Sequence, residues 1–184
     1  MHRTTDELES ALHEIREAPR DRGTVDLIVS RPSPGERVMH ERADLDTEVG
    51  LVGDTWSIRP SRGTGAPDPD AQLNIMSARA VAAIAGDRER WALAGDQLFV
   101  DLDLSGDNLP PGTRLGIGEA VIEVTATPHT GCAKFTERFG LDAMRLVNSE
   151  VGRELNLRGI CARVVSAGTI RHGDAIEKHV VQLG

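Results

Sequence analysis

The sequence has no tyrosine, and aromatic residues make up only 3% of its 184 residues. No apolar run approaches the roughly 20 residues that a membrane-spanning helix requires, and the N-terminal stretch MHRTTDELESALHE lacks a hydrophobic signal core. With 19 glycines and nine prolines along the chain, this composition favours a turn-rich fold with an aliphatic core. We therefore expect a cytoplasmic protein that does not enter a membrane.

Cysteine is scarce, and common catalytic motifs are absent. Cys132 and Cys161, the only two cysteines, are 29 positions apart and match neither a C-x-x-C zinc pattern nor a disulfide framework. The sequence also contains no Walker A loop, no G-x-G-x-x-G after a strand, no H-E-x-x-H and no G-x-S-x-G. Because a cytoplasmic compartment keeps cysteines reduced, any chemistry of these two residues is expected to be that of free thiols.

Positive charge is scarce over most of the chain. The formal net charge is -8, whereas nucleic acids and acidic membranes attract clustered positive charge. Residues 128–184 hold eight Lys and Arg against six Asp and Glu, or +2, and residues 1–127 hold the remaining 13 and 23, or -10. We therefore expect no nucleic-acid or membrane partner, and we expect a small anion to bind only in the C-terminal third.

The order of the sequence patterns predicts an α+β protein that is mainly β, with one β-barrel and short peripheral helices. At 184 residues a single domain is the simplest arrangement, and we place it at 23–184 after an N-terminal helical extension at 1–22. In that extension Thr4 and Glu7 form a capping box, and apolar residues follow at helical spacing. Short strands bounded by Gly-Asp turns favour a barrel over a doubly wound fold.

Further elements follow from capping and alternation signals. Ser77 is expected to cap a helix over ARAVAAIAGDRERWAL, and Gly140 interrupts a helical segment at 133–147. The loop at 59–70 is either a lid over a pocket or simply mobile. Predicted strands cover VDLIV, QLNIM, GDQLFVDLDLS, the PPGTRLGIGEAVIEVT hairpin and two strands with a turn in GICARVVSAGTIRHGDAIEKH.

The surroundings of Cys132 in the sequence suit a reactive thiol. The thiolate is the form that attacks or binds metals, and its pKa falls at a helix N-terminus or beside cations. Gly131 allows a sharp turn, a helix is predicted from Ala133, and Lys134 and Arg138 follow. The alternative is that Cys132 is a small buried apolar residue, as most free cysteines are.

Other titratable residues near Cys132 leave alternatives open. His129 is either a base or ion-pair partner for the thiol, or an exposed loop histidine. Cys161, inside the apolar run ICARVV, is expected to lie in the core. A series of cations suits a phosphate, or else ordinary surface pairs such as Arg138 with Asp142. The series is Lys134, Arg138, Arg145, Arg153, Arg158 and Arg163.

The stretch GDQLFVDLDLSGDNLPPGTRLGIGEAVIEVTATPHTGCAKFTERFG resembles a MOSC domain, the module named after the C-terminal part of molybdenum cofactor sulfurases. GLVGDTW, QLNIM and GRELNLRGICARVVSAGTIRHGD fit the same order of segments, so the resemblance covers most of the chain from about residue 25 onward. It implies a β-rich, barrel-like fold and one key cysteine after the hairpin, which is Cys132 here. In this family the cysteine is proposed to carry a persulfide or, in relatives that reduce amidoximes and N-hydroxylated bases, to bind the molybdenum of molybdopterin.

The resemblance gives a first hypothesis, a MOSC protein that binds molybdenum cofactor, carries sulfur as a persulfide on Cys132, or both. In the cofactor version Cys132 is the metal ligand, and Cys132 and His129 are the catalytic residues. The phosphate and pterin are assigned to Lys134, Arg138, Asn148 and Arg153.

Other proteins must complete such a reaction. The sequence shows no iron–sulfur cysteines, flavin motif or pyridoxal-phosphate domain, so reduction of N-hydroxylated substrates would need an external electron-donor protein, and sulfur transfer a sulfur-donor protein. The alternative hypothesis is a non-catalytic barrel that binds a small ligand and has a buried, structural Cys132. The substrate and the oligomeric state stay open at this point.

Overall fold

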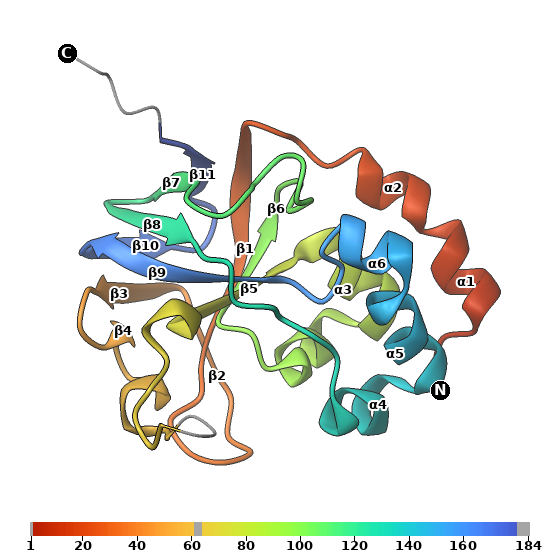
Figure 1. Cartoon of the computed structure of the whole chain (residues 1–184), viewed down its shortest axis with the longest axis horizontal. Helices are drawn as coiled ribbons and strands as arrows, with labels where there is room; N and C mark the ends of the chain where they lie inside the picture. The colour runs from red at the N-terminus through yellow and green to blue at the C-terminus, as the bar shows by residue number, and fades with distance from the viewer. Residues whose placement is uncertain (1, 61–63, 180–184) are drawn as a thin grey trace.

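The computed structural model describes residues 2–60 and 64–179, and Figure 1 shows its strands gathered on one side and its short helices on the other. The strands are β1 (Arg22–Ser30), β2 (Val38–His40), β3 (Arg42–Asp46), β4 (Gly50–Leu51), β5 (Leu73–Ser77), β6 (Leu98–Asp101), β7 (Arg114–Ile117), β8 (Ala120–Val124), β9 (Ile160–Ser166), β10 (Gly168–Arg171) and β11 (Ala175–Lys178). The α-helices are α1 (Thr5–Ser10), α2 (Leu12–Arg16), α3 (Ala78–Ala85), α4 (Ala133–Phe139), α5 (Leu141–Asn148) and α6 (Glu150–Glu154). The 3₁₀ helices of these residues are η1 (Trp56–Ile58), η2 (Pro69–Ala71) and η3 (Arg88–Ala94).

Seven of the strands form a closed barrel. Neighbouring strands follow the order β11, β7, β8, β9, β5, β6 and β1, and β1 pairs back with β11 to close the ring. β2 lies outside the ring as a further strand on β1. Within the ring, β5 and β6 are parallel and the other pairs are antiparallel. The predicted mainly β barrel with short peripheral helices is confirmed.

Alternation along the strands separates two apolar cores. On β6, Leu98 and Val100 belong to a cluster made of strand and loop residues, whereas Phe99 belongs to a cluster that includes helix residues such as Val81. Successive side chains of a strand point to opposite faces, so the first cluster fills the barrel and the second lies between the barrel and the helices. Aliphatic residues dominate the barrel interior, as the composition predicts.

A smaller sheet, with the order β10, β3, β4, packs against the same interior. It contributes Leu45, Leu51 and Ile170 to the barrel cluster. The predicted C-terminal pair of strands is therefore three strands, because β10 leaves the barrel sheet to pair with β3 before the chain returns in β11.

Capping signals gave correct helix starts and one incorrect helix end. Thr4 and Glu7 form both hydrogen bonds of the capping box of α1, and the Ser77 side chain accepts from the N–H of Ala80 at the start of α3. The helix predicted over ARAVAAIAGDRERWAL ends at Ala85 and continues as η3 after Gly86, whose φ of 73° a side-chain-bearing residue rarely adopts.

The remaining expectations concern loops and membranes. Gly140 separates α4 from α5, as predicted. In the predicted loop at 59–70, residues 61–63 lie outside the described residues, and the backbone carbonyl of Asp68 accepts a hydrogen bond from Nε1 of Trp56 at 3.1 Å. Within 2–60 and 64–179, no helix has the length and apolar character needed to cross a membrane.

Candidate functional site

Cys132 lies at the surface, where α4 begins. It occupies the N-cap position of α4, as the sequence predicts, and it is exposed. The preceding N–H group, of Gly131, donates to Oδ1 of Asn148 on α5 over 3.3 Å. A Cβ atom at Gly131 would lie 2.5 Å from Sδ of Met144, so a glycine allows this segment to lie against α5. The burial of Cys132 that the alternative hypothesis requires is wrong.

His129 lies close to an acid on the turn before β6. Its Nδ1 atom lies 3.4 Å from Oδ1 of Asp96, and only 12% of its side chain is exposed. Burial lowers the pKa of His129 to about 4 against the opposing effect of Asp96, and the charge of Arg158 lowers it further. His129 is therefore a neutral, mostly buried residue, so the exposed loop histidine is wrong. In the described residues its Nδ1 atom and Oδ1 of Asp96 have no hydrogen-bond partner, and it makes no hydrogen bond with Cys132.

Asp96 also forms a buried ion pair with Arg158. Nη1 of Arg158 lies 2.7 Å from Oδ2 of Asp96, and the two side chains are 8% and 0% exposed. The Arg158 guanidinium also lies 5.0 Å from the ring centroid of Phe135 on α4. Removal of either partner would leave a buried charge uncompensated. Because Arg158 also packs on Phe135, this pair fixes the turn before β6 relative to α4.

The turn at residues 93–95 collects arginines from distant parts of the chain. Its three successive carbonyl oxygens accept hydrogen bonds, in order, from Arg138 at 2.6 Å, Arg158 at 2.9 Å and Arg31 at 3.0 Å. Each arginine comes from a different segment, so the turn holds α4, the end of β1 and the segment before β9 together.

Four arginine side chains converge beside this turn, and we call them the arginine cluster: Arg31, Arg37, Arg59 and Arg138. A Cβ atom at Gly95 would lie 3.7 Å from Nη2 of Arg37 and 4.0 Å from Nη1 of Arg138. Partial burial lowers the pKa of the Arg37 guanidinium, and the charges of the other three arginines lower it further. The like charges are thus close enough to repel one another.

The arginine cluster is only partly neutralised by the protein. Nη2 of Arg31 lies 2.8 Å from Oδ2 of Asp54, and both side chains are buried. No carboxylate from 2–60 or 64–179 forms an ion pair with Arg37, Arg59 or Arg138. The buried Nε atom of Arg37 has no hydrogen-bond partner there. This surplus of positive charge suits an anion with several oxygen atoms.

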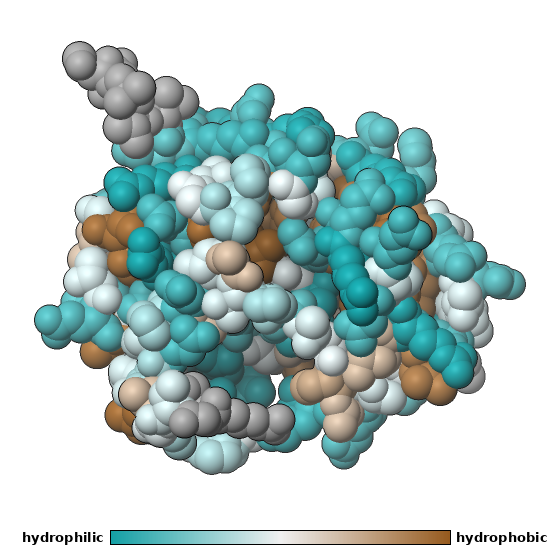
Figure 2. Space-filling model, viewed as in Figure 1, coloured by the Kyte–Doolittle hydropathy of each residue, from teal (hydrophilic) through white to brown (hydrophobic). Residues whose placement is uncertain are grey.

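The surface is hollowed between the elements that carry the cluster. Figure 2 shows a hollow between the part of the surface over β2 and the segment after β4 and the part over α4. Arg37 directly precedes β2, Arg59 follows η1, and Arg138 lies on α4. These three residues therefore lie on, or directly next to, elements that border the hollow.

The predicted C-terminal cation series does not form one group. Arg163 binds Glu123 at 2.7 Å on the outside of the barrel, and Arg145 pairs with Asp142 at 3.7 Å. Arg138 binds a backbone carbonyl instead of Asp142, so the predicted surface pair of these two residues is wrong. Folding separates these cations because they lie on elements that face different directions.

Three of the predicted site residues meet at another place. His129, Asn148 and Arg153, together with Arg158, line a cavity of about 320 Å³ beside the segment that leads to Cys132. Lys134 is exposed on the first turn of α4. Of the predicted site residues, His129, Asn148 and Arg153 therefore line this cavity, Arg138 belongs to the arginine cluster, and Cys132 and Lys134 belong to neither group.

Charge counting missed Arg31, Arg37 and Arg59, because they lie in the part of the sequence with a net charge of -10. The Gly-Asp pairs, which we interpret from the sequence only as turns, contain a signal that points to buried arginines such as Arg31. Asp54 follows Gly53 and holds Arg31, while Asp96 follows Gly95 and holds Arg158. The acid of such a turn, once buried, needs a cation.

The second cysteine has a different environment. Cys161 is buried on β9, and its Sγ lies 3.4 Å from Oδ1 of Asn74. Burial raises the pKa of the Cys161 thiol to about 12, so the predicted core role is confirmed. Across the described part of the chain, no three His, Cys, Asp or Glu side chains are grouped so that they could hold a metal ion.

Comparisons with known proteins agree with this fold. The MOSC domain family model matches residues 62–177, and no curated protein matches the chain. The YUAD protein of Bacillus subtilis superposes with a TM-score of 0.65 at 19% identity, covering 88% of this chain and 97% of that protein. YiiM of Escherichia coli superposes with a TM-score of 0.58 at 22% identity, covering 87% and 70%. YiiM of Geobacillus stearothermophilus gives 0.52 at 14% identity, covering 88% and 75%.

Proposed function

The chain belongs to the MOSC domain family, and we propose that it binds molybdopterin with the metal on Cys132 and the phosphate on the arginine cluster. The observation that carries this proposal is that α4 joins the two sites, since it begins at the exposed Cys132 and contributes Arg138. Arg138 follows the thiol by six residues, or roughly 9 Å along the helix axis.

The arginine cluster fits the phosphate of such a cofactor. Guanidinium groups bind phosphate oxygens through paired N–H donors, and a dianion would offset the repulsion that lowers the pKa of Arg37. The buried Nε atom of Arg37, which has no partner in the described residues, is a donor that such an anion would satisfy.

Cys132 fits the metal. Thiolates are soft ligands that suit metals bound through sulfur, and a metal carried by its own sulfur-bearing pterin needs few further ligands from the protein. A single exposed thiol therefore suffices. When bound, the cofactor would supply the redox centre for the reduction of N-hydroxylated substrates, with electrons from a donor protein.

The protein's own residues would order the segment that carries the thiol. His129 precedes Cys132 by three residues and is a neutral, mostly buried ring beside Asp96, so we assign it to positioning Cys132 instead of acting as its base. Asn148 holds the N–H of Gly131. Asn148 and Arg153 also line the 320 Å³ cavity, where they offer polar groups to the edge of a pterin, and Lys134 stays a candidate for the phosphate.

The test is the cofactor content of protein purified from a host that makes molybdopterin. Molybdenum is measured by elemental analysis and pterin by fluorescence after oxidation, in the wild type and in Cys132→Ala, Arg37→Ala and Arg145→Ala. We expect both in the wild type, loss of metal in Cys132→Ala, about tenfold less pterin in Arg37→Ala, and no change in the surface control Arg145→Ala. Wild-type protein with neither molybdenum nor pterin would contradict the proposal.

The exposure of Cys132 also favours a second candidate function, in which the thiol carries sulfur as a persulfide from a sulfur-donor protein. This function needs an accessible thiol and does not need the arginine cluster. Cyanide releases persulfide sulfur as thiocyanate, so cyanolysable sulfur should be present after incubation with a persulfide donor and absent in Cys132→Ala. Equal amounts in both proteins would exclude Cys132 as the carrier.

A further inference from the structure

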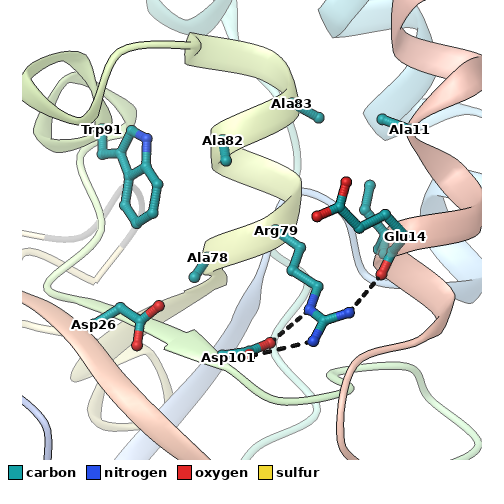
Figure 3. A pocket seen from close by; sticks show the side chains of 10 residues that line it. Ala11, Glu14, Asp26, Ala78, Arg79, Ala82, Ala83, Trp91 and Asp101 are labelled. Carbon is teal, nitrogen blue, oxygen red and sulfur yellow. Dashed lines mark hydrogen bonds and ion pairs between the residues drawn. The ribbon is translucent and has the colours of Figure 1, made fainter.

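A cleft of about 480 Å³ opens between α2 and α3 on the outside of the barrel. We call it the α2–α3 cleft, and Figure 3 shows the side chains that line it. Its lining carries no residue of the arginine cluster and does not include Cys132. The residues that line it are Ala11, Glu14, Ile15, Asp26, Ala78, Arg79, Ala82, Ala83, Trp91 and Asp101.

The cleft has a surplus of negative charge. Three carboxylates and one guanidinium line it, so two negative charges are uncompensated within the lining. Arg79 neutralises Asp101, with Nε 2.7 Å from Oδ1 and Nη2 3.3 Å from Oδ2. The two carboxylates without an ion pair are those of Asp26 and Glu14, and the charge of Arg79 also acts on Glu14. Within the described residues, the only hydrogen bond to the Asp26 carboxylate comes from the Thr24 hydroxyl, whose Oγ1 lies 2.8 Å from Oδ1.

Asp26 lies at a β-bulge in β1. Val25 is opposite Val100 and Leu27 is opposite Phe99, so Asp26 is the extra residue in this strand pair. After the bulge, Leu27 belongs to the outer core and Ile28 to the barrel interior. Ordinary alternation after the inward-facing Val25 directs Asp26 outward, and the bulge lets Leu27 face outward beside it.

The floor of the cleft is made of methyl groups. Ala78 and Ala82 are one turn apart on α3, and Figure 3 shows them between Asp26 on one side of the helix and Glu14 on the other. Trp91 adds an aromatic wall. A ligand lying across α3 would therefore contact apolar surface in its middle and a carboxylate at each end.

We propose that the α2–α3 cleft binds a linear aliphatic diamine or polyamine, with its methylene chain over the alanines and an ammonium group on each of Asp26 and Glu14. Methylene groups gain about 0.8 kcal/mol each when they are buried, and ammonium groups are strong donors to carboxylates. This ligand matches both the number of uncompensated charges and their separation by an apolar floor. The site goes beyond the proposed cofactor function and does not depend on it.

Besides Arg79 of the lining, a second cation of the protein lies close to this site. Arg88 donates to the backbone carbonyl of Asp26, and its guanidinium lies 5.0 Å from the ring centroid of Trp91. In the described residues it forms no ion pair with the Asp26 carboxylate, so that carboxylate stays available. Because Arg88 is positive, it should weaken the binding of an amine, and Arg88→Gln should bind the same diamine more tightly than the wild type.

The experiment is calorimetric titration with a series of unbranched α,ω-diamines from 1,3-diaminopropane to 1,8-diaminooctane, with butylamine as the matched monoamine. We expect saturable binding of one diamine, an optimum chain length, and binding weaker by about tenfold for butylamine, Asp26→Asn and Glu14→Gln. Ala82→Leu fills the floor and should abolish binding, whereas Glu48→Gln, an exposed acid elsewhere, should change nothing.

Two outcomes would overturn the proposal. If no diamine shows saturable binding, the site is excluded. If the affinity is the same for all chain lengths, or is unchanged in Asp26→Asn and Glu14→Gln, the amines bind through the general negative charge of the protein. Thermal unfolding of each variant checks that it is folded. Molybdenum content, measured on the same preparations, tests the cofactor proposal separately.

Discussion

Asp96 and Arg158 form an ion pair that is almost completely enclosed by the protein, with 2.7 Å between Oδ2 and Nη1. The same aspartate faces Nδ1 of His129 through its other oxygen. The barrel turn before β6 therefore lies against the segment that leads to Cys132.

Replacement of Asp96 by Asn should lower the free energy of unfolding by about 3–5 kcal/mol, because it leaves Arg158 as a buried charge without a counter-ion. Urea denaturation measures this loss. The matched control is Asp142→Asn, which breaks the exposed pair with Arg145 and should cost less than about 1 kcal/mol. Similar losses in the two variants would show that the Asp96 pair is not important for stability.

His129 should make stability depend on pH between about 6.5 and 4. Burial lowers its pKa in the folded protein to about 4, while the unfolded chain has the ordinary value of about 6.5. As the pH falls below about 6.5, the unfolded state takes up the proton first, so the free energy of unfolding decreases, by about 2 kcal/mol at pH 5. The full contribution is present above about pH 6.5 and is lost as the pH falls to about 4.

Urea denaturation at several pH values tests this dependence. The slope between pH 7 and pH 5 should be smaller in His129→Gln than in the wild type. It should be unchanged in His13→Gln, a variant of an exposed histidine on α2. An identical slope in His129→Gln and the wild type would mean that His129 is not buried as a neutral ring.

Much of the fold could be predicted because its signals are local. The capping box at Thr4, the cap at Ser77 and the break at Gly140 each depend on a few neighbouring residues, and all three are present in the structure. The hairpin of β7 and β8 follows from alternating apolar residues around a turn. Barrel closure by β1 and β11 joins the two ends of the chain, and only the general abundance of short strands pointed to it.

Only the part of the candidate site that a single rare residue marks in the sequence could be predicted. Cys132 was found because it is one of two cysteines in a suggestive setting, whereas the arginine cluster joins Arg31, Arg37 and Arg59 to Arg138 across 79 to 107 positions of sequence. A count of charges along the chain cannot detect such a group, because proximity in the fold is set by the packing of β1, β2 and α4. The four arginines become neighbours only when the chain is folded.

Gly159 should tolerate no side chain. Its φ is 111°, and a Cβ atom would lie 2.3 Å from the backbone oxygen of Ile75, an atom of the barrel that cannot move aside easily. Gly159→Ala should therefore cost more than about 3 kcal/mol. Gly35→Ala is the control, since Gly35 has a φ of 83° and open space around it, and its backbone strain alone should cost about 1 kcal/mol. Equal losses in urea denaturation would contradict the close contact at Gly159.

Inorganic phosphate should stabilise the protein through the arginine cluster. A ligand that binds only the folded state raises the free energy of unfolding in proportion to the logarithm of its concentration, so the unfolding temperature should rise as phosphate is added. Arg37→Leu removes a guanidinium that three other arginines repel. This variant should therefore be at least as stable as the wild type without phosphate and should lose most of the rise.

The control for this prediction is Arg145→Leu, which removes an equal charge at an exposed pair. It should keep the phosphate effect, and chloride at matched ionic strength should not reproduce that effect in the wild type. If Arg37→Leu and Arg145→Leu responded equally to phosphate, the stabilisation would come from general screening of charge. A response lost only in Arg37→Leu would place the anion at the arginine cluster, because Arg37 faces the charges of Arg31, Arg59 and Arg138 there.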